Sequence, residues 1–197
     1  MTALRRFGLL APLAALSLAG CGLNSIPTAE ENVNAKWGQV QSEYQRRSDL
    51  IPNLVSTVKG YAKQESDVLI KVTEARASAG RATLSAADLS DPAKVRAFND
   101  AQNQLTQAII PLQRLQEAYP DLKSNANFLT LQSQIEGTEN SILVARKDYN
   151  EAVQGYNTRI RTFPDAIGAK IFYGAKPKVP FEASAGSQAA PKVDFNT

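Results

Sequence analysis

Three long segments of this sequence carry apolar residues at alternating steps of three and four, and this spacing most constrains the fold. It places the apolar side chains along one side of an α-helix, whereas a half-buried β-strand needs an apolar residue at every second position. No alternating run of β-branched residues interrupts the segments. The spacing therefore predicts an all-α protein: an elongated antiparallel bundle of three long helices with a short fourth helix.

The first segment extends from about residue 30 to residue 80 and contains Pro52. Two apolar positions recur in each heptad, and only Arg47 and Glu65 interrupt them. Because the stripe keeps its phase across Pro52, we expect one helix that is kinked there. The alternative is a helix that restarts with Asp49 as its N-cap and Pro52 in its first turn, where a missing N–H is harmless. The stripe comprises Val33, Trp37, Val40, Tyr44, Ile51, Leu54, Val58, Tyr61, Val68, Val72, Ala75 and Ala79.

The second segment has a clear start signal. Asp91 followed by Pro92 is typical of an N-cap and the first helical residue. We expect this helix to contain a second kink, at Pro111, and to end near Tyr119. Its apolar face comprises Val95, Phe98, Leu105, Ile109, Leu112 and Leu115.

The third segment follows a cap at Ser124 or Asn125 and runs to Pro164. Beyond this proline, residues 165–174 (DAIGAKIFYG) predict the short fourth helix. The stripe of the third segment comprises Phe128, Leu131, Ile135, Thr138, Ile142, Ala145, Tyr149, Ala152, Tyr156, Ile160 and Phe163.

The three helices differ in expected length. At about 1.5 Å per residue, they would be about 75, 42 and 58 Å long. The second and third helices cannot cover the whole of the first, so we expect its first turns, with Val33 and Trp37, to protrude as a stalk. An exposed tryptophan there would suit a lipid interface or a second copy of the protein.

The N-terminus (MTALRRFGLLAPLAALSLAGC) has the features of a secretory signal, because two arginines precede an apolar run that is too short to cross a bilayer. The run LAGC, which ends at Cys21, resembles the lipobox of bacterial lipoproteins. In such signals, cleavage leaves the cysteine as the new N-terminus, and its thiol carries a diacylglycerol. The alternative is an uncleaved helical anchor. In either case the body of the protein would be tethered to a membrane and face outward.

These features divide the chain into a lipoprotein signal peptide (1–20), a tether (21–28), a helical bundle (29–175) and a flexible C-terminal tail (176–197). Within the tail, Val179 and Phe181 are the residues most suited to dock. We expect the protein in the bacterial cell envelope, anchored through a lipid on Cys21 and facing the periplasm. Gly22 resembles the residue after the cysteine in Gram-negative outer-membrane lipoproteins, which favours the outer membrane over the inner one.

Composition excludes several kinds of site. The chain has no histidine, so it lacks the usual general base and the commonest metal ligand. Its single cysteine excludes an intrachain disulfide and a cysteine-rich zinc site. Without residues 1–20 the chain has 20 basic and 19 acidic side chains, so its charge gives no reason to expect nucleic acid as a partner. We predict no catalytic residue, no cofactor and no metal site.

Arg47 and Glu65 occupy positions that face the interior of the predicted bundle. An unpaired charge there would cost several kcal/mol, so each needs a partner on another helix, for which Glu139 and Arg146 are candidates. A polar layer of this kind fixes helix register, and its charged residues would also satisfy the carbonyl group that Pro52 leaves without a donor. The alternative is a solvated face with paired charges. The candidate interior polar site comprises Arg47, Glu65, Glu139, Arg146, Tyr149 and Asn150.

Several runs of the sequence resemble the LemA family: YQRRSDLIPNLVSTVKGYAKQE, VTEARA, EAYPDLKSNANFLTLQSQIEGTENSILVARKDYNEAVQGYNTRIRTFP and IFYG. Together they span about residues 30–175 in the family's order. The resemblance implies a membrane anchor followed by a helical bundle, and it implies no particular activity. This chain has a lipobox where members of the family commonly have a transmembrane helix. The family's motif positions fall on Arg46, Arg47, Asp49, Pro52, Asn53, Tyr119, Pro120, Glu139, Asn140, Arg146, Tyr149, Asn150, Tyr156 and Asn157.

Two hypotheses on function follow. In the first, the protein is a membrane-anchored scaffold or interaction module, not an enzyme, and its partner is an envelope protein or a second copy. In the second, it is a ligand-binding or enzymatic module that uses the interior polar site. A well-formed pocket lined by Arg47, Glu139 and Tyr149 would favour the second. We prefer the first, because no motif marks a reactive group.

Overall fold

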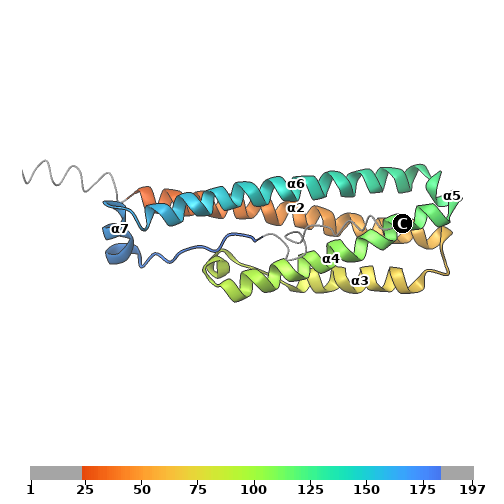
Figure 1. The fold of residues 1–197 in the computed structure, drawn as a ribbon, viewed down its shortest axis with the longest axis horizontal. Coiled ribbons are helices and arrows are strands. Elements are labelled where there is room, and N and C mark those ends of the chain that lie inside the picture. The colour runs from red at the N-terminus through yellow and green to blue at the C-terminus, as the bar shows by residue number, and fades with distance from the viewer. Residues whose placement is uncertain (1–23, 183–197) are drawn as a thin grey trace, which may run out of the picture.

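Four long helices alternate in direction along one axis of the molecule (Figure 1). The computed structural model describes residues 24–182, and in this range it contains helices, turns and irregular segments but no strand. The all-α fold is therefore confirmed. In chain order the elements are α2 (Ser25–Tyr61), α3 (Ser66–Arg81), the short helix η1 (Ala86–Ser90), α4 (Pro92–Ala118), α5 (Pro120–Lys123), α6 (Ala126–Arg159), α7 (Asp165–Gly168) and η2 (Ala169–Tyr173).

The first predicted helix is in fact two helices. The chain reverses over residues 62–65, so that α3 folds back and packs against α4. The heptad pattern continued across the turn because both helices face one core: Val58 on α2 and Val72 on α3 are fully buried. Tyr61, which the pattern placed in the interior, is 43% exposed at the turn. Periodicity cannot reveal such a reversal, because folding back buries the same apolar stripe that a continuous helix would bury.

Both internal prolines lie inside helices, Pro52 in α2 and Pro111 in α4, so neither starts a new helix. Pro52 lacks the N–H that would bond to the carbonyl of Ser48. Instead, Nε of Arg76 on α3 donates to that carbonyl at 2.8 Å. The donors predicted for this role were the charged residues of the interior site. The donor is an arginine of α3 because the reversal of the chain places α3 beside the proline.

The start signals of the second and third segments are confirmed. The side chain of Asp91 accepts hydrogen bonds from two backbone N–H groups of the first turn of α4, and Pro92 is the first residue of that helix. Asn125 caps α6 by accepting a hydrogen bond from a backbone N–H group. The short fourth helix is present as α7 and η2. Phe163, predicted to be interior, is 82% exposed, because α6 ends at Arg159.

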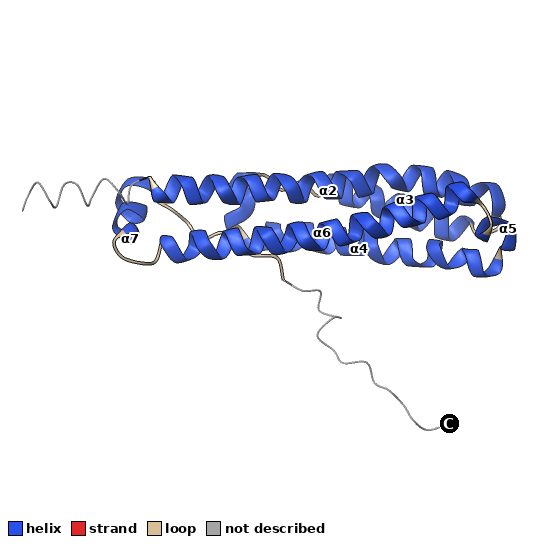
Figure 2. Cartoon of the chain, turned by 90° about the horizontal axis from the view of Figure 1, so that it is seen from above, coloured by secondary structure: helices blue, strands red, loops and turns tan. Residues whose placement is uncertain are grey.

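The helices differ in how far they extend along the bundle. α2 has 37 residues and α6 has 34, so they are about 55 and 51 Å long, and they pack along each other. α3 has only 16 residues, about 24 Å. The α3–α4 hairpin therefore leaves the start of α2 uncovered, and a segment that follows η2 runs along this part instead (Figures 1 and 2). We call this segment, residues 175–182, the C-terminal strap.

The predicted stalk is wrong. Val33 is 0% and Trp37 2% exposed. The Trp37 ring lies 5.4 Å from that of Phe98 and 5.9 Å from that of Phe181 in the C-terminal strap, and its Nε1 donates to the carbonyl of Leu84 at 3.2 Å. The strap and residues 82–91 cover Trp37 in the place where α3, if it were as long as α2, would have covered it. Helix lengths alone could not indicate this.

The bundle also begins earlier and ends later than predicted. α2 starts at Ser25, and Ile26 is 1% exposed, so part of the predicted tether 21–28 belongs to the core. At the other end, Phe181 is 6% exposed, so the predicted flexible tail 176–197 contributes its first residues to the core. The predicted signal peptide and the lipidation site Cys21 lie outside the described residues.

Replacing Arg76 with methionine is expected to lower the free energy of unfolding by about 1 kcal/mol, because the carbonyl of Ser48 loses its donor. In a Pro52→Ala background the same replacement should cost less, since the alanine N–H can bond to that carbonyl. Urea denaturation of the two single variants and the double variant measures this coupling. Arg81→Met, at an exposed position of α3, is the control. Equal costs of the Arg76 change in both backgrounds would contradict the role assigned to Arg76.

Candidate functional site

A layer of polar side chains crosses the middle of the core. The buried apolar residues form two clusters, one toward residue 24 and one toward α5. At the boundary, α2, α4 and α6 each contribute a buried polar residue: Arg47 is 1%, Gln102 6% and Thr138 1% exposed. With Thr106 and Glu139, which lie beside them, these residues form what we call the Arg47 layer.

Arg47 donates hydrogen bonds to two other helices. Its Nη1 donates to the carboxylate of Glu139 on α6 and to the hydroxyl of Thr106 on α4, both at 2.8 Å. Its Nη2 donates to Oε1 of Gln102 at 2.7 Å and to the backbone carbonyl of the same residue at 3.3 Å. The side chain of Glu139 is 31% exposed, so the carboxylate keeps part of its hydration. The ion pair therefore joins α2 to α6 and loses less hydration than a fully buried pair would lose, while the other hydrogen bonds of Arg47 reach α4.

Tyr44 lies one turn before Arg47 and packs against it. The centre of the guanidinium is 5.1 Å from the centre of the Tyr44 ring, which is a cation–π geometry. Burial raises the pKa of Tyr44, while the positive charges of Arg146 and Arg47 act in the opposite direction. The ring is therefore neutral at physiological pH and serves as a packing surface for the buried charge.

The structure brings two of the six residues of the predicted interior site into direct contact, Arg47 and Glu139, and a third, Arg146, hydrogen-bonds to Tyr44, the residue that packs on Arg47. Glu65 lies at the end of the bundle near α5, where it accepts a hydrogen bond from the hydroxyl of Tyr119 at 3.1 Å. The other three lie a heptad or more beyond Glu139 on α6, about 10 Å or more toward residue 24. These three residues hydrogen-bond to the C-terminal strap: Arg146, Tyr149 and Asn150.

Two asparagines of α6 hold the C-terminal strap by its backbone. The side chain of Asn150 donates to the carbonyl of Phe181 at 2.9 Å and accepts from its N–H at 2.8 Å. Asn157 makes the same pair of bonds with Lys178, at 2.8 and 2.9 Å. Seven residues of a helix span about 10.5 Å, and three residues of an extended chain span about 10 Å. The two asparagines therefore match the spacing of the strap, which runs antiparallel to α6.

Further contacts fix both ends of the strap. The chain leaves η2 at Gly174, whose φ of 54° lies in the left-handed region that favours glycine. The hydroxyl of Tyr149 donates to the carbonyl of Val179 at 3.0 Å. Burial raises the pKa of Tyr149, so this hydroxyl stays a donor at physiological pH. A guanidinium nitrogen of Arg146 donates to the carbonyl of Glu182 at 2.9 Å.

Several residues of these two sites were not among the predicted site residues: Gln102, Thr106, Asn157 and Lys178. A signal for Asn157 was present, because the pair Tyr-Asn occurs at residues 149–150 and again one heptad later at residues 156–157. Each tyrosine is in the core, and each asparagine lies beside it facing the strap. Gln102 and Thr106 gave no signal, since polar residues at such positions usually face solvent.

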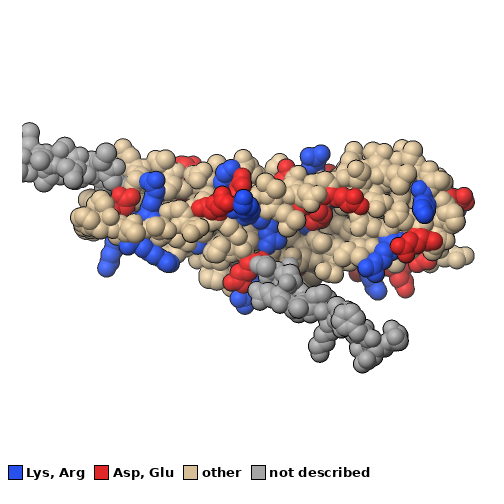
Figure 3. Space-filling model, turned by 45° about the horizontal axis from the view of Figure 1, so that its top comes forward, with Lys and Arg blue, Asp and Glu red and all other residues tan. Residues whose placement is uncertain are grey.

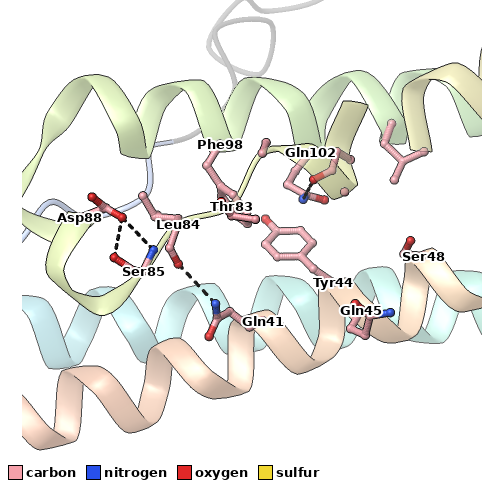
Figure 4. A pocket seen from close by; sticks show the side chains of 14 residues that line it. Gln41, Tyr44, Gln45, Ser48, Thr83, Leu84, Ser85, Asp88, Phe98 and Gln102 are labelled. Atoms are coloured by element: carbon pink, nitrogen blue, oxygen red, sulfur yellow. Dashed lines mark hydrogen bonds between the residues drawn. The ribbon is translucent and has the colours of Figure 1, made fainter. Parts of the chain in front are cut away.

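A cavity of about 400 Å³ opens between α2 and residues 82–85, beside the Arg47 layer (Figure 4). Arg47, Glu139 and Tyr149 are not among the residues that line it. Side chains of α2 and α4 form two walls, and residues 82–85 form a third. The lining combines polar and apolar side chains, among them those of Gln41, Tyr44, Ser48, Leu84, Phe98 and Gln102.

Several of the polar groups around this cavity already have protein partners. Gln41 donates from Nε2 to the carbonyl of Leu84 at 3.3 Å. Asp88 accepts hydrogen bonds from Lys94 and Ser85, which lower the pKa of its carboxyl to about 2. Within residues 24–182, no group of three or more Cys, Asp or Glu side chains is arranged to hold a metal ion.

Residues 36–195 match the model of the LemA family. The protein belongs to the LemA family. The matched range of this LemA protein includes both the Arg47 layer and the C-terminal strap. The chain is also similar to Protein LemA of Metamycoplasma hominis, with 26% identity over 124 residues, or 63% of this chain and 52% of the relative. The chain thus spans about half the length of the curated relative it matches. None of the helices in residues 24–182 is long and apolar enough to cross a membrane.

Replacing Glu139 with alanine is expected to lower the free energy of unfolding by about 3 kcal/mol, because the buried charge of Arg47 loses its counterion. Adding Arg47→Met in this background should restore part of the lost stability, since methionine fills the space without a charge. Urea denaturation of the three variants measures both effects. Glu136→Ala, at an exposed position one turn earlier on α6, should change stability by less than about 0.5 kcal/mol. A double variant less stable than Glu139→Ala alone would contradict this account of the layer.

Proposed function

We propose that this LemA family protein is a lipid-anchored scaffold of the bacterial cell envelope that faces the periplasm and holds a partner away from the membrane surface. The observation that carries the proposal is the use of its interior polar groups. Arg47 and Glu139 bond to each other, and Tyr149 and Asn150 bond to the backbone of the strap. A reactive site needs such groups aimed at a substrate. A rod that uses them to hold its own segments is suited to presenting a surface, and in this proposal it has no catalytic activity.

The anchor is proposed at Cys21, on the basis of the run LAGC. This cysteine stands four residues before Ser25, the first residue of α2. A lipid on Cys21 would therefore hold the start of α2 close to the bilayer, with outer-membrane attachment favoured by Gly22. α2 is about 55 Å long, so α5 at the other end would project into the periplasm by about that distance.

The outer face of α6 supports the idea of a protein partner. Leu143 and Val144 are adjacent on this helix, and they are 62% and 60% exposed. Exposed large apolar side chains at neighbouring positions favour protein contacts over solvent. The proposed partner is an envelope protein or a second copy of this chain.

The cavity beside the Arg47 layer favours a second candidate function, the binding of a small ligand. Its volume of about 400 Å³ lies within the range of small-molecule sites. Tyr44 and Phe98 give it aromatic walls, and Gln102 is one of the three glutamines that line it. The site of this candidate is the cavity between α2, residues 82–85 and α4, and not the Arg47–Glu139 pair itself.

Replacing Cys21 with serine is expected to move the protein from the membrane fraction to the soluble periplasmic fraction, because the acylated thiol is lost. Intact mass spectrometry of the wild-type protein should show a mass above that of the chain from residue 21, by the mass of the lipid. Ser25→Ala, four residues away, is the control and should leave both fractionation and lipid mass unchanged. A Cys21→Ser protein that stays in the membrane fraction with unchanged mass would overturn the proposed anchor.

The scaffold is tested by a photo-crosslinking amino acid at position 143 in intact cells, followed by mass spectrometry. The expected result is a discrete crosslinked protein that is absent when the same group replaces Lys71, an exposed residue of α3. The absence of any crosslinked protein, together with a small molecule that copurifies with wild type and is lost in Gln102→Ala, would favour the second candidate over the scaffold.

A further inference from the structure

The end of the bundle formed by α7 and η2 carries a cluster of exposed apolar side chains. Phe163 is 82% exposed, Ile167 53%, Ile171 69%, Phe172 69% and Tyr173 45%. These are five of the ten large apolar side chains that are exposed in residues 24–182, and they fall within one stretch of eleven residues. We call this stretch, residues 163–173, the tip. Exposed apolar side chains gathered in this way indicate a surface that binds another protein or a membrane.

The tip lies at the end of the molecule where α2 begins (Figure 1). The hydroxyl of Ser25 donates to the carboxylate of Asp165 at 2.7 Å, and α7 packs against α2. Four residues of extended chain reach at most about 14 Å, so a lipid on Cys21 would place the bilayer within reach of the tip. The inference therefore rests on the anchor of the proposed function.

Basic residues surround the apolar side chains of the tip. Residues 159–176 contain four exposed basic side chains and a single acidic one, Asp165. Figure 3 shows blue Lys and Arg side chains gathered at this end of the molecule. Each basic residue near an anionic leaflet contributes about 1 kcal/mol to binding. The basic residues are Arg159, Arg161, Lys170 and Lys176.

We propose that the tip is a membrane-docking surface, which inserts Phe163, Ile171 and Phe172 into the interface of an anionic phospholipid bilayer. Aromatic and aliphatic side chains bordered by Lys and Arg are the composition that suits the boundary between headgroups and acyl chains. A symmetric contact between the tips of two copies is disfavoured, because it would bring the two sets of four basic residues together. With the lipid at Cys21, the tip gives the rod a second point of attachment and fixes its orientation on the membrane.

The test uses the lipidated full-length mature protein in vesicles of phosphatidylethanolamine and phosphatidylglycerol. The substitution Phe172→Trp places a fluorophore on the tip, and Leu143→Trp places one on the exposed face of α6 as the matched control. The native Trp37 is buried and gives the same background in both variants. Lipids with brominated acyl chains quench an indole that enters the bilayer.

We expect quenching of the Phe172→Trp variant to exceed that of the Leu143→Trp variant several-fold, and to fall when phosphatidylcholine replaces phosphatidylglycerol. Equal quenching of the two variants would overturn membrane docking by the tip. Quenching that does not depend on the anionic lipid would overturn the role of the basic residues. A blue shift of the Phe172→Trp emission without vesicles would indicate a second copy as the occupant and would also overturn the proposal.

The failure of the proposed anchor gives a different result. If Cys21 carries no lipid, the wild-type protein and the Cys21→Ser variant float equally well with the vesicles in a density gradient. If the anchor is correct and the tip does not dock, the wild-type protein floats with the vesicles and the Cys21→Ser variant does not. The fluorescence of the Phe172→Trp variant then stays unquenched. Flotation therefore tests the anchor and quenching tests the tip, so the two failures are distinguishable.

Discussion

The buried guanidinium of Arg47 is the constraint on which the arrangement of the helices depends. A charged group in the core needs acceptors for its donors, and here Thr106, Gln102 and Glu139 accept from the two Nη atoms of Arg47, whereas its buried Nε has no hydrogen-bond partner. Sliding α2 by one turn along its neighbours would leave the charge without these partners. The apolar clusters on either side would tolerate a shift of one helix along another, so the polar layer fixes the register of the helices.

The C-terminal strap covers the part of the core that the helices leave open because their lengths are unequal. The α3–α4 hairpin is too short to cover α2 and α6 along their whole length, and without another element Trp37 would be exposed. Asn150 and Asn157 bind the strap through its backbone groups, so the peptide is held without a sheet edge. Phe181 then packs on the aromatic cluster around Trp37. An element of no regular secondary structure thus completes the core.

The Arg47 layer and the C-terminal strap hold together a rod whose two ends differ in chemistry. Toward α5 the bundle closes with a short helix, whereas toward residue 24 it ends in the apolar tip bordered by basic residues. The helix lengths predicted an exposed stalk at this same end, with Trp37 suited to a lipid interface or to a second copy of the protein. Tertiary packing instead buries Trp37 and leaves Phe163 and Phe172 exposed. The composition of the rod's body is nearly neutral, so the positive charge of the tip is local.

The sequence by itself determined the all-α class, the cap at Asp91 and the need of a buried Arg47 for a counterion, because these depend on local signals or on the cost of an unpaired charge. It favoured a helix that continues through Pro52, a cap at Ser124 or Asn125, and Glu139 as one candidate partner, and the structure decided among these alternatives. It could not determine the reversal at residues 62–65, since a stripe of apolar residues is equally consistent with one long helix and with two antiparallel ones. It could not place Arg76 on the carbonyl of Ser48 or the strap on α6, because these contacts join residues 21 to 36 positions apart. Only the tertiary structure decided them, because the energy of a buried polar group depends on partners that folding brings to it.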